Sequence, residues 1–273
     1  MKKRAALAMA SLLLIALLLL QACDRSRLVT TVTLVIDGDS VTVKALNGTV
    51  RLIGIDAPET RSGSKPAGQF ADEAKDYLEM ITRESGKVTL ELHGKDTYGR
   101  HLAYLFDSEG TLINSDIVRQ GLARPLTYED TSHYSSEIRN AYREAFRSRR
   151  GIFTFYDQSP VFDASIVRGN LHSYQSGGFL GRVIWVEFEV TSVNGLTLVG
   201  DDIVVRIRSE EASLFALDQA DLQVLYRKRI RVYGEVWQDT SGKALMLIRD
   251  PGIEIIGVAQ LAKTLPLLPL GAF

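Results

Sequence analysis

Two short turn signals constrain the fold of this 273-residue chain more than any other feature. Asp37-Gly38 and Asn47-Gly48 separate three runs of mostly apolar and β-branched residues, at 29–36, 41–46 and 50–55. Such pairs between strand-like runs are typical of tight β-hairpins. The sequence therefore predicts a meander of three antiparallel strands near the start of the chain.

The remaining sequence alternates between helical and strand-like patterns. Apolar residues at helical spacing predict a helix between 65 and 86, with Phe70, Ala74, Tyr77, Leu78 and Ile81 on its inner face. Further helices are expected at 115–120, 132–149 and 210–220. Further strands are expected at 87–93, 102–106, 181–190, 196–199, 203–208, 229–237 and 244–248.

These patterns predict six consecutive parts. Residues 1–22 form a signal peptide, 23–28 a tether, 29–155 a first domain, 156–178 a linker, 179–258 a smaller β domain and 259–273 an apolar tail. The composition, 45% hydrophobic and 24% charged, is that of a folded globular protein.

The N-terminus has the pattern of a secretion signal. Positive residues at 2–4 precede an apolar run at 5–20, which at sixteen residues suits a signal peptide better than a membrane span of about 20. The stretch LQAC at 20–23 resembles the lipobox of bacterial lipoproteins, which implies lipidation of Cys23 and cleavage just before it. Asp24 resembles an inner-membrane retention signal. The alternatives are an uncleaved anchor helix, or a secreted protein in which Cys23 is incidental.

The charge balance shows no surplus of positive charge that would attract polyanions in general. Cleavage before Cys23 would remove three of the 32 basic residues and leave 29 against 33 acidic ones, a net charge of −4. Residues 31–153 carry 16 Lys and Arg against 18 Asp and Glu, and residues 165–257 carry 10 against 12, so both segments have a net charge of −2. Non-specific affinity for nucleic acid comes mostly from cationic contacts, so tight binding of this kind is not expected.

Carboxylates gather at the turns of the predicted meander. Asp39 follows the first turn and Asp56 ends the third strand, so hairpin connections can bring them together. Two carboxylates, a backbone carbonyl and water would suit a hard cation such as Ca²⁺. The alternative is that Asp37 and Asp39 are ordinary turn residues and that Asp56 caps a loop.

Two arginines favour a catalytic interpretation. Arg51 lies in a strand of mainly apolar neighbours, where a charge needs a partner or a ligand. Arg100 follows a Tyr-Gly turn between two predicted strands. Guanidinium groups match phosphate oxygens with paired hydrogen bonds. Carboxylates, a cation and two arginines together indicate a phosphodiester site.

Four motifs in order, IDGDSV, RLIGIDAPET, KDTYGRHLAYLF and VRQGLA, resemble the staphylococcal nuclease (thermonuclease) family over roughly residues 29–153. The resemblance implies a mainly β fold with helices, a five-stranded OB-fold-like barrel with three helices. It also implies Ca²⁺-dependent endonuclease cleavage of DNA and RNA that leaves 3′-phosphate ends.

The resemblance also implies roles for individual residues. Asp39 and Asp56 would bind Ca²⁺ through their side chains, and Ala57 through its backbone carbonyl. Glu59 would orient or deprotonate the attacking water. Arg51 and Arg100 would hold the phosphate and its transition state.

The sequence departs from the family pattern where substrate is bound. Only Tyr128 could replace the tyrosines that pack the nucleotide, and the lysine-rich loop is reduced to Arg61 and Lys65. Lys95 and Tyr98 are further candidates for substrate contact, or they shape the turn. These departures predict weak, salt-sensitive binding rather than altered chemistry.

The second half carries no dense group of carboxylates and arginines. Its strand pattern predicts a second, smaller OB-like β-barrel. Arg227–Arg231 with Tyr226, Tyr233 and Trp237 could bind single strands, because stacking and cationic contacts serve that purpose. The alternative is a solvated edge strand with aromatic residues in the core.

These features together predict a lipid-anchored bacterial nuclease of the cell envelope, held at the inner membrane and facing the periplasm. The alternative is a weak or inactive nucleic-acid-binding or envelope-assembly lipoprotein that keeps the nuclease fold. Protein partners are not predicted.

Overall fold

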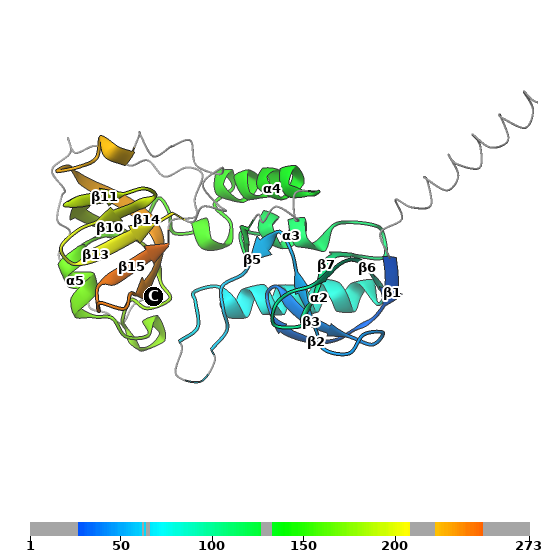
Figure 1. Cartoon of the computed structure of the whole chain (residues 1–273). Helices are drawn as coiled ribbons and strands as arrows, with labels where there is room; N and C mark the ends of the chain where they lie inside the picture. Colours follow the sequence, from blue (N-terminus) through cyan, green and yellow to red (C-terminus); the bar gives the residue numbers. More distant parts are fainter. Residues whose placement is uncertain (1–26, 62, 64–65, 127–132, 208–221, 248–273) are drawn as a thin grey trace, which may run out of the picture.

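The computed structural model describes residues 27–61, 63, 66–126, 133–207 and 222–247. They form two sheet-based units that lie side by side (Figure 1). Among the described residues, no helix is both long enough and apolar enough to cross a membrane.

The first unit is built on a six-stranded sheet of order β1-β6-β7-β4-β3-β2. Its strands are β1 (Arg27–Thr30), β2 (Val32–Asp37), β3 (Ser40–Val43), β4 (Thr49–Leu52), β6 (Val88–Lys95) and β7 (His101–Phe106). The antiparallel meander is confirmed, because β2 pairs with β3 and β3 with β4, but its third strand ends at Leu52 rather than at residue 55. A separate ladder joins β5 (Ile55–Asp56) to β8 (Arg124–Pro125).

The predicted five-stranded barrel is not found in that form. The expected first strand is divided at Thr31 into β1 and β2, which lie at opposite ends of the strand order. Because one residue separates them in the chain, the sheet must curl until its two ends approach each other. No pairing of β1 with β2 closes the sheet within the described part of the chain.

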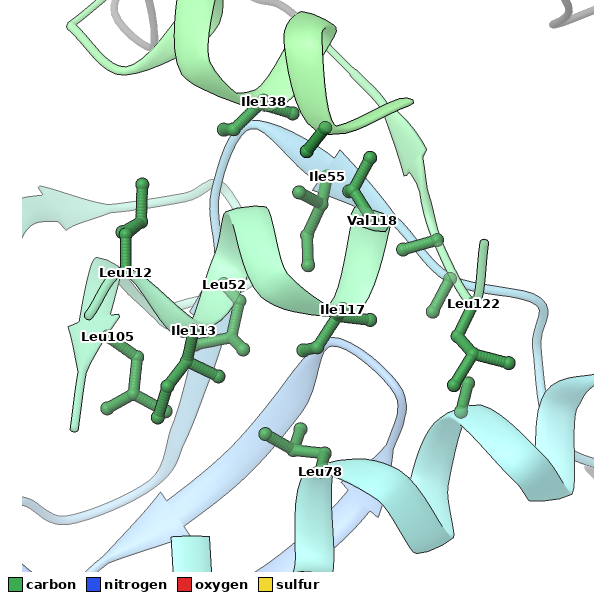
Figure 2. Close-up of a cluster of buried hydrophobic side chains, with 14 of the residues drawn as sticks. Leu52, Ile55, Leu78, Leu105, Leu112, Ile113, Ile117, Val118, Leu122 and Ile138 are labelled. Carbon is green, nitrogen blue, oxygen red and sulfur yellow. The ribbon is translucent and has the colours of Figure 1, made fainter. Parts of the chain in front are cut away.

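The described part of this unit contains three α-helices, as predicted: α2 (Ala71–Ser85), α3 (Ile113–Arg119) and α4 (Ser135–Arg147). Helix α4 packs against α3 and β8. Figure 2 shows α3 between α2 and α4, with Ile117 pointing to the side of Leu78 and Val118 to the side of Ile55 and Ile138. All five side chains are buried in one hydrophobic core.

One polar side chain inside this core ties α3 to the sheet. The amide of Asn114 donates to the carbonyl of Ile53 at 2.8 Å and accepts from the backbone N–H of Leu105 at 2.9 Å. The backbone that leads from β4 to β5 is thereby fixed from within.

The second unit is a seven-stranded sheet of order β11-β12-β13-β15-β14-β10-β9. Its strands are β9 (Val161–Asp163), β10 (Val183–Glu189), β11 (Ser192–Asn194), β12 (Thr197–Val199), β13 (Ile203–Arg206), β14 (Arg229–Gln238) and β15 (Ala244–Leu247). Helix α5 (Ala164–Gly169) and the 3₁₀ turns η2 (Gly151–Phe153) and η3 (Tyr174–Ser176) complete the described elements.

This sheet differs from the predicted second barrel. The strand order runs from β11 to β9 without a closing ladder among the described residues, and two of its pairings are parallel, β9 with β10 and β13 with β15. Part of the stretch predicted as a linker, 161–169, forms β9 and α5. The predicted helix at 210–220 lies outside the described residues.

Strand β10 is buried on both faces. Ile184, Val186 and Phe188 belong to the core of the second unit, whereas Val183 and Trp185 pack in the core of the first. Successive side chains of a strand point to opposite faces, so one strand serves two cores. The two units therefore share a continuous apolar contact.

Candidate active site

Asp39 occupies the tip of the β2–β3 hairpin. The ladder pairs Asp37 with Ser40, so Gly38 and Asp39 form a two-residue turn. A Cβ at Gly38 would lie 2.6 Å from the Ala74 Cβ and 2.7 Å from the Ala57 Cβ, so only glycine allows this approach. The turn is thus pressed against α2 and against the residue after Asp56.

Asp56 ends the short strand β5, which follows the turn at Gly54. Gly54 has a φ of +79°, a conformation that favours glycine. Across the β5–β8 ladder, Asp56 lies opposite Arg124 and Ile55 opposite Pro125. The N–H of Leu126 donates to the carbonyl of Gly54 at 2.9 Å. This second ladder fixes the backbone on which Asp56 is carried.

Arg51 connects the two carboxylates. Its Nη1 lies 2.8 Å from Asp39 Oδ2, and its Nη2 lies 3.3 Å from Asp56 Oδ1. Nη1 also donates to the carbonyl of Leu52 at 2.9 Å. All three side chains are largely buried, with exposed fractions of 13%, 8% and 17% for Arg51, Asp39 and Asp56. The structure therefore brings these three predicted site residues together.

Two neutral groups complete the surroundings of Asp39. The backbone N–H of Ala57 donates to Asp39 Oδ2 at 2.8 Å, and the hydroxyl of Ser40 donates to Oδ1 at 2.9 Å. Asp37 accepts the backbone N–H of Asp39 at 3.1 Å, as a turn residue does.

The electrostatic environment of Asp39 is strongly perturbed. Burial raises its pKa to about 8, and the neighbouring carboxylates of Asp37 and Asp56 add to the rise. The guanidinium of Arg51 and the N–H of Ala57 oppose it. Burial and two neighbouring carboxylates therefore disfavour the ionised form of Asp39, and a bound cation would favour it.

These residues fit a small oxygen-ligated cation, with water completing the shell. Ca²⁺ takes six to eight oxygen ligands, and Asp39 and Asp56 offer carboxylate oxygens beside the backbone of Ala57. The described residues contain no group of three or more His, Cys, Asp or Glu side chains arranged to hold a metal ion. An ion here would therefore depend on backbone oxygens and water for most of its ligands.

Glu59 lies three residues beyond Asp56, with its side chain exposed to solvent. Its backbone carbonyl accepts the N–H of Gly68 at 2.9 Å, which closes the loop between β5 and α2. The structure thus fixes the backbone of Glu59 near Asp56 and leaves its carboxylate in solvent.

Arg100 is held by its own turn. Its Nε donates to Asp96 Oδ2 at 2.7 Å and its backbone N–H donates to Asp96 Oδ1 at 2.9 Å. Desolvation favours the neutral form of Asp96, but these contacts outweigh it and hold the pKa of that carboxyl below its usual range. Parallel pairing of β4 with β7 sets Arg51 opposite Leu102, two residues after Arg100. Arg51 therefore lies on β4, and Arg100 lies immediately before the neighbouring strand β7.

Two of the candidate substrate contacts, Lys95 and Tyr98, lie beside or within the same turn. Tyr98 is 85% exposed, and the Arg100 guanidinium carbon lies 5.7 Å from the centre of its ring. Lys95 is exposed at the end of β6. Tyr128 and the lipidation candidate Cys23 lie outside the described residues.

Two supporting residues were not predicted from the sequence. Asp96 holds Arg100, and its position four residues before an arginine in a turn was a usable signal. Arg124 lies opposite Asp56, but nothing in its local sequence indicated a pairing with a two-residue strand.

Comparison with known proteins finds relatives of the first unit. The family model described as "Staphylococcal nuclease homologue" matches residues 49–154. The chain is 30% identical to the thermonuclease of Staphylococcus hyicus over 123 residues, which cover 44% of this chain and 72% of that protein. It is 29% identical to endonuclease YhcR of Bacillus subtilis over 137 residues, 45% of this chain and 11% of that protein. An uncharacterized endonuclease of Escherichia coli O157:H7 is 29% identical over 131 residues, 46% of this chain and 77% of that protein.

Proposed function

The chain belongs to the staphylococcal nuclease family, and we propose accordingly that it is a nuclease that hydrolyses phosphodiester bonds of DNA, RNA or both. The observation that carries the proposal is the position of Arg51, within ion-pair distance of both Asp39 and Asp56. One guanidinium and two carboxylates thereby lie together, although the two aspartates are 17 residues apart in the sequence.

Asp39, Asp56 and the carbonyl of Ala57 would hold Ca²⁺ in this proposal. When bound, the ion polarises the phosphoryl oxygen and offsets the charge that develops on it. A bound cation would also favour the ionised form of Asp39, which burial and the carboxylates of Asp37 and Asp56 disfavour. Ser40 and the Ala57 N–H would keep Asp39 in a fixed orientation.

Glu59 would act on the attacking water. Its carboxylate is exposed, so water reaches it directly, and the Gly68 contact keeps its backbone in place. A carboxylate within reach of a water molecule can orient it and accept its proton.

Arg51 and Arg100 would stabilise the phosphate as negative charge grows on its oxygens. A guanidinium presents five N–H donors in a fixed plane, so one edge can be held by a carboxylate while another meets phosphate. Asp96 contacts the Nε of Arg100 in this manner. Preformed donors of this kind stabilise a transition state without reorganisation.

Substrate affinity should be low and sensitive to salt. The net charge of −2 over residues 31–153 gives little general attraction for a polyanion. Binding would rely on local contacts from Lys95, Tyr98 and Tyr128. Cleavage should therefore weaken markedly between low and physiological salt, and a rate that is constant over this range would contradict this part of the proposal.

The decisive experiment assays residues 24–273 on double-stranded DNA, single-stranded DNA and RNA, with Ca²⁺ and with a chelator. We expect cleavage that requires Ca²⁺ and leaves 3′-phosphate ends, detected by end-group analysis of the products. Absence of cleavage with every substrate would favour the alternative, a binding or envelope-assembly protein that keeps the nuclease fold.

We further propose that the mature protein is a lipoprotein attached to the inner membrane and facing the periplasm. The motif at 20–23 and Asp24 support this proposal. Several acyl chains on Cys23 would anchor the protein firmly, since a single chain binds only marginally. The Cys23→Ser variant should lack lipid in mass analysis of the membrane fraction.

A further inference from the structure

An ion pair is buried between the two units. Arg124 Nη1 lies 3.1 Å from Glu235 Oε2, and the side chains are only 3% and 4% exposed. Arg124 belongs to β8 of the first unit, and Glu235 to β14 of the second. Within the described residues, Arg124 Nη1 makes no well-aligned hydrogen bond, so this contact is mainly electrostatic.

Arg124 connects this ion pair to the candidate active site. Its backbone lies opposite Asp56 in the two-residue ladder between β5 and β8. A ladder of two residues has few contacts of its own, so its position depends on what holds each strand. Arg124 is held by a buried charge of the second unit.

Glu235 also contacts the loop between β5 and α2, which carries Glu59. A Cβ at Gly68 would lie 2.8 Å from Glu235 Oε1, so the carboxylate lies directly against this glycine. The N–H of Gly68 donates to the carbonyl of Glu59 at 2.9 Å. One carboxylate of the second unit thus contacts both the strand beside Asp56 and the residue that holds Glu59.

Neighbouring backbone contacts join the same loop to the second unit. The N–H of Gln69 donates to the carbonyl of Gly181 at 2.7 Å, and the N–H of Val183 donates to the Gln69 side chain at 3.0 Å. Both contacts lie immediately after Gly68. The loop that carries Glu59 is therefore tied to the second unit at its C-terminal end.

We propose that Glu235 is a positioning residue for the nuclease site and that the second unit is part of the catalytic structure. The proposal rests on the proposed function. Glu235 acts through Arg124 on the strand of Asp56, and through Gly68 on the backbone of Glu59. Its substitution should change the geometry of catalysis more than the attachment of the two units.

The attachment of the two units is also supported by contacts that do not involve Glu235. Trp185 Nε1 donates to the carbonyl of Tyr156 at 2.8 Å, and the Tyr233 hydroxyl donates to the carbonyl of Ile152 at 2.8 Å. The rings of Tyr156, Trp185 and Tyr233 pack against one another with centroid distances of 4.9 to 5.3 Å. These contacts do not involve Glu235, so the Glu235→Gln variant should keep the units docked.

The test compares full mature chains carrying Glu235→Gln and Glu187→Gln. Glu187 is a matched control because it is a partly buried glutamate on the adjacent strand, and its ion pairs with Arg229 and Arg231 stay inside the second unit. Four quantities are measured: kcat, KM, Ca²⁺ affinity by titration calorimetry, and hydrogen exchange of the amides at 55–69 without Ca²⁺.

We expect Glu235→Gln to lower kcat at least tenfold with KM changed less than threefold, to weaken Ca²⁺ binding several-fold, and to speed exchange at 55–69 at least tenfold. Glu187→Gln should leave all four quantities within twofold of the unmodified protein. Unchanged kcat and exchange in Glu235→Gln would overturn the proposal.

A double variant keeps the test valid if Glu235→Gln alone does not fold. Loss of one partner leaves a buried charge unpaired, so Arg124→Gln with Glu235→Gln removes both charges together. If only this double variant folds, it should still show the lower kcat and faster exchange, and values like those of the unmodified protein would overturn the proposal. An inactive unmodified protein would defeat the proposed nuclease function alone, because the exchange experiment requires no catalysis.

Discussion

Arg51 Nη1 lies 2.8 Å from Asp39 Oδ2, so the guanidinium proposed to hold phosphate is also the counter-ion of a buried carboxylate. The same guanidinium reaches Asp56 through Nη2. In the proposed mechanism Arg51 therefore has two roles, because it pairs with the two carboxylates before substrate binds and would contact the phosphate afterwards. Substitutions of Arg51 should reveal both roles.

Replacement of Arg51 by lysine should separate charge from shape. The guanidinium of Arg51 contacts the two carboxylates with different nitrogens of its planar group, whereas the lysine ammonium is a compact charge on one nitrogen and cannot reproduce both contacts. We expect Arg51→Lys to lower kcat roughly 10²- to 10³-fold, as loss of a transition-state donor does. Stability should fall by about 1–3 kcal/mol, because polar partners in the pocket lose their contacts. Steady-state kinetics and urea unfolding measure the two effects, and a kcat within threefold of the original would contradict the phosphate role.

Replacement of Asp39 or Asp56 by asparagine should weaken metal binding while preserving the fold. In Asp39→Asn the amide oxygen could still accept the Ala57 N–H, but one ligand charge is lost. Affinity for Ca²⁺ depends on the number of charged ligands, so a loss of about tenfold or more is expected in each variant. Titration calorimetry measures it, with Asp202→Asn as the control, because Asp202 pairs with Arg168 in the second unit. Equal Ca²⁺ affinity in all three variants would exclude the assigned ligands.

The hairpins and their carboxylates were predictable because the information is local. Asp37-Gly38 and Asn47-Gly48 specify turns within a few residues, and the ladders of β2, β3 and β4 follow from them. The meander also led us to expect Asp39 near Asp56, but Asp56 lies beyond the meander on β5, and β5 pairs with β8. Helix α2 was predictable for the same reason, since its apolar spacing is contained in its own sequence.

The curling of the sheet and the shared core were not predictable in this way. The division of the first strand at Thr31 depends on which partners each half finds, β6 or β3, and these lie far apart in the chain. Trp185 has the pattern of an ordinary strand residue, yet it packs in the core of the other unit. The Arg124–Glu235 pair joins residues from different units, and no local spacing encodes it.

Replacement of Glu59 by glutamine should slow the chemical step without affecting folding. The side chain is exposed, so its substitution removes no buried contact. Loss of a general base typically costs 10²- to 10⁴-fold in rate, and kcat should fall by roughly that factor. Thermal unfolding should be unchanged. Glu109→Gln, at another exposed glutamate, is the matched control in single-turnover assays, and equal rates in the two variants would remove Glu59 from the mechanism.

The second unit offers a pH-dependent contribution to stability at Asp163. Its carboxylate accepts the Ser165 N–H at 3.0 Å as the N-cap of α5 and pairs with Arg229 Nη2 at 2.6 Å. Desolvation opposes ionisation, but the Ser165 and Arg229 contacts outweigh it and hold the pKa of Asp163 below its ordinary value of 3.8. A carboxylate whose pKa is lower in the folded state stabilises the protein above its unfolded-state pKa, and this stabilisation is lost as the pH falls through the folded value.

Replacement of Asp163 by alanine should therefore destabilise the protein more where the carboxylate is ionised than where it is protonated. At pH 7 the expected loss is about 1 kcal/mol, the usual effect of removing an N-cap, because the ion pair is partly exposed and adds little. The difference from the unmodified protein should shrink below about pH 4 as Asp163 takes up its proton. Asp163→Asn keeps a capping oxygen without the charge, so it should lose less at pH 7. Urea unfolding at several pH values measures all three proteins, and a loss in Asp163→Ala that is equal at pH 7 and pH 3 would show that the charge contributes nothing.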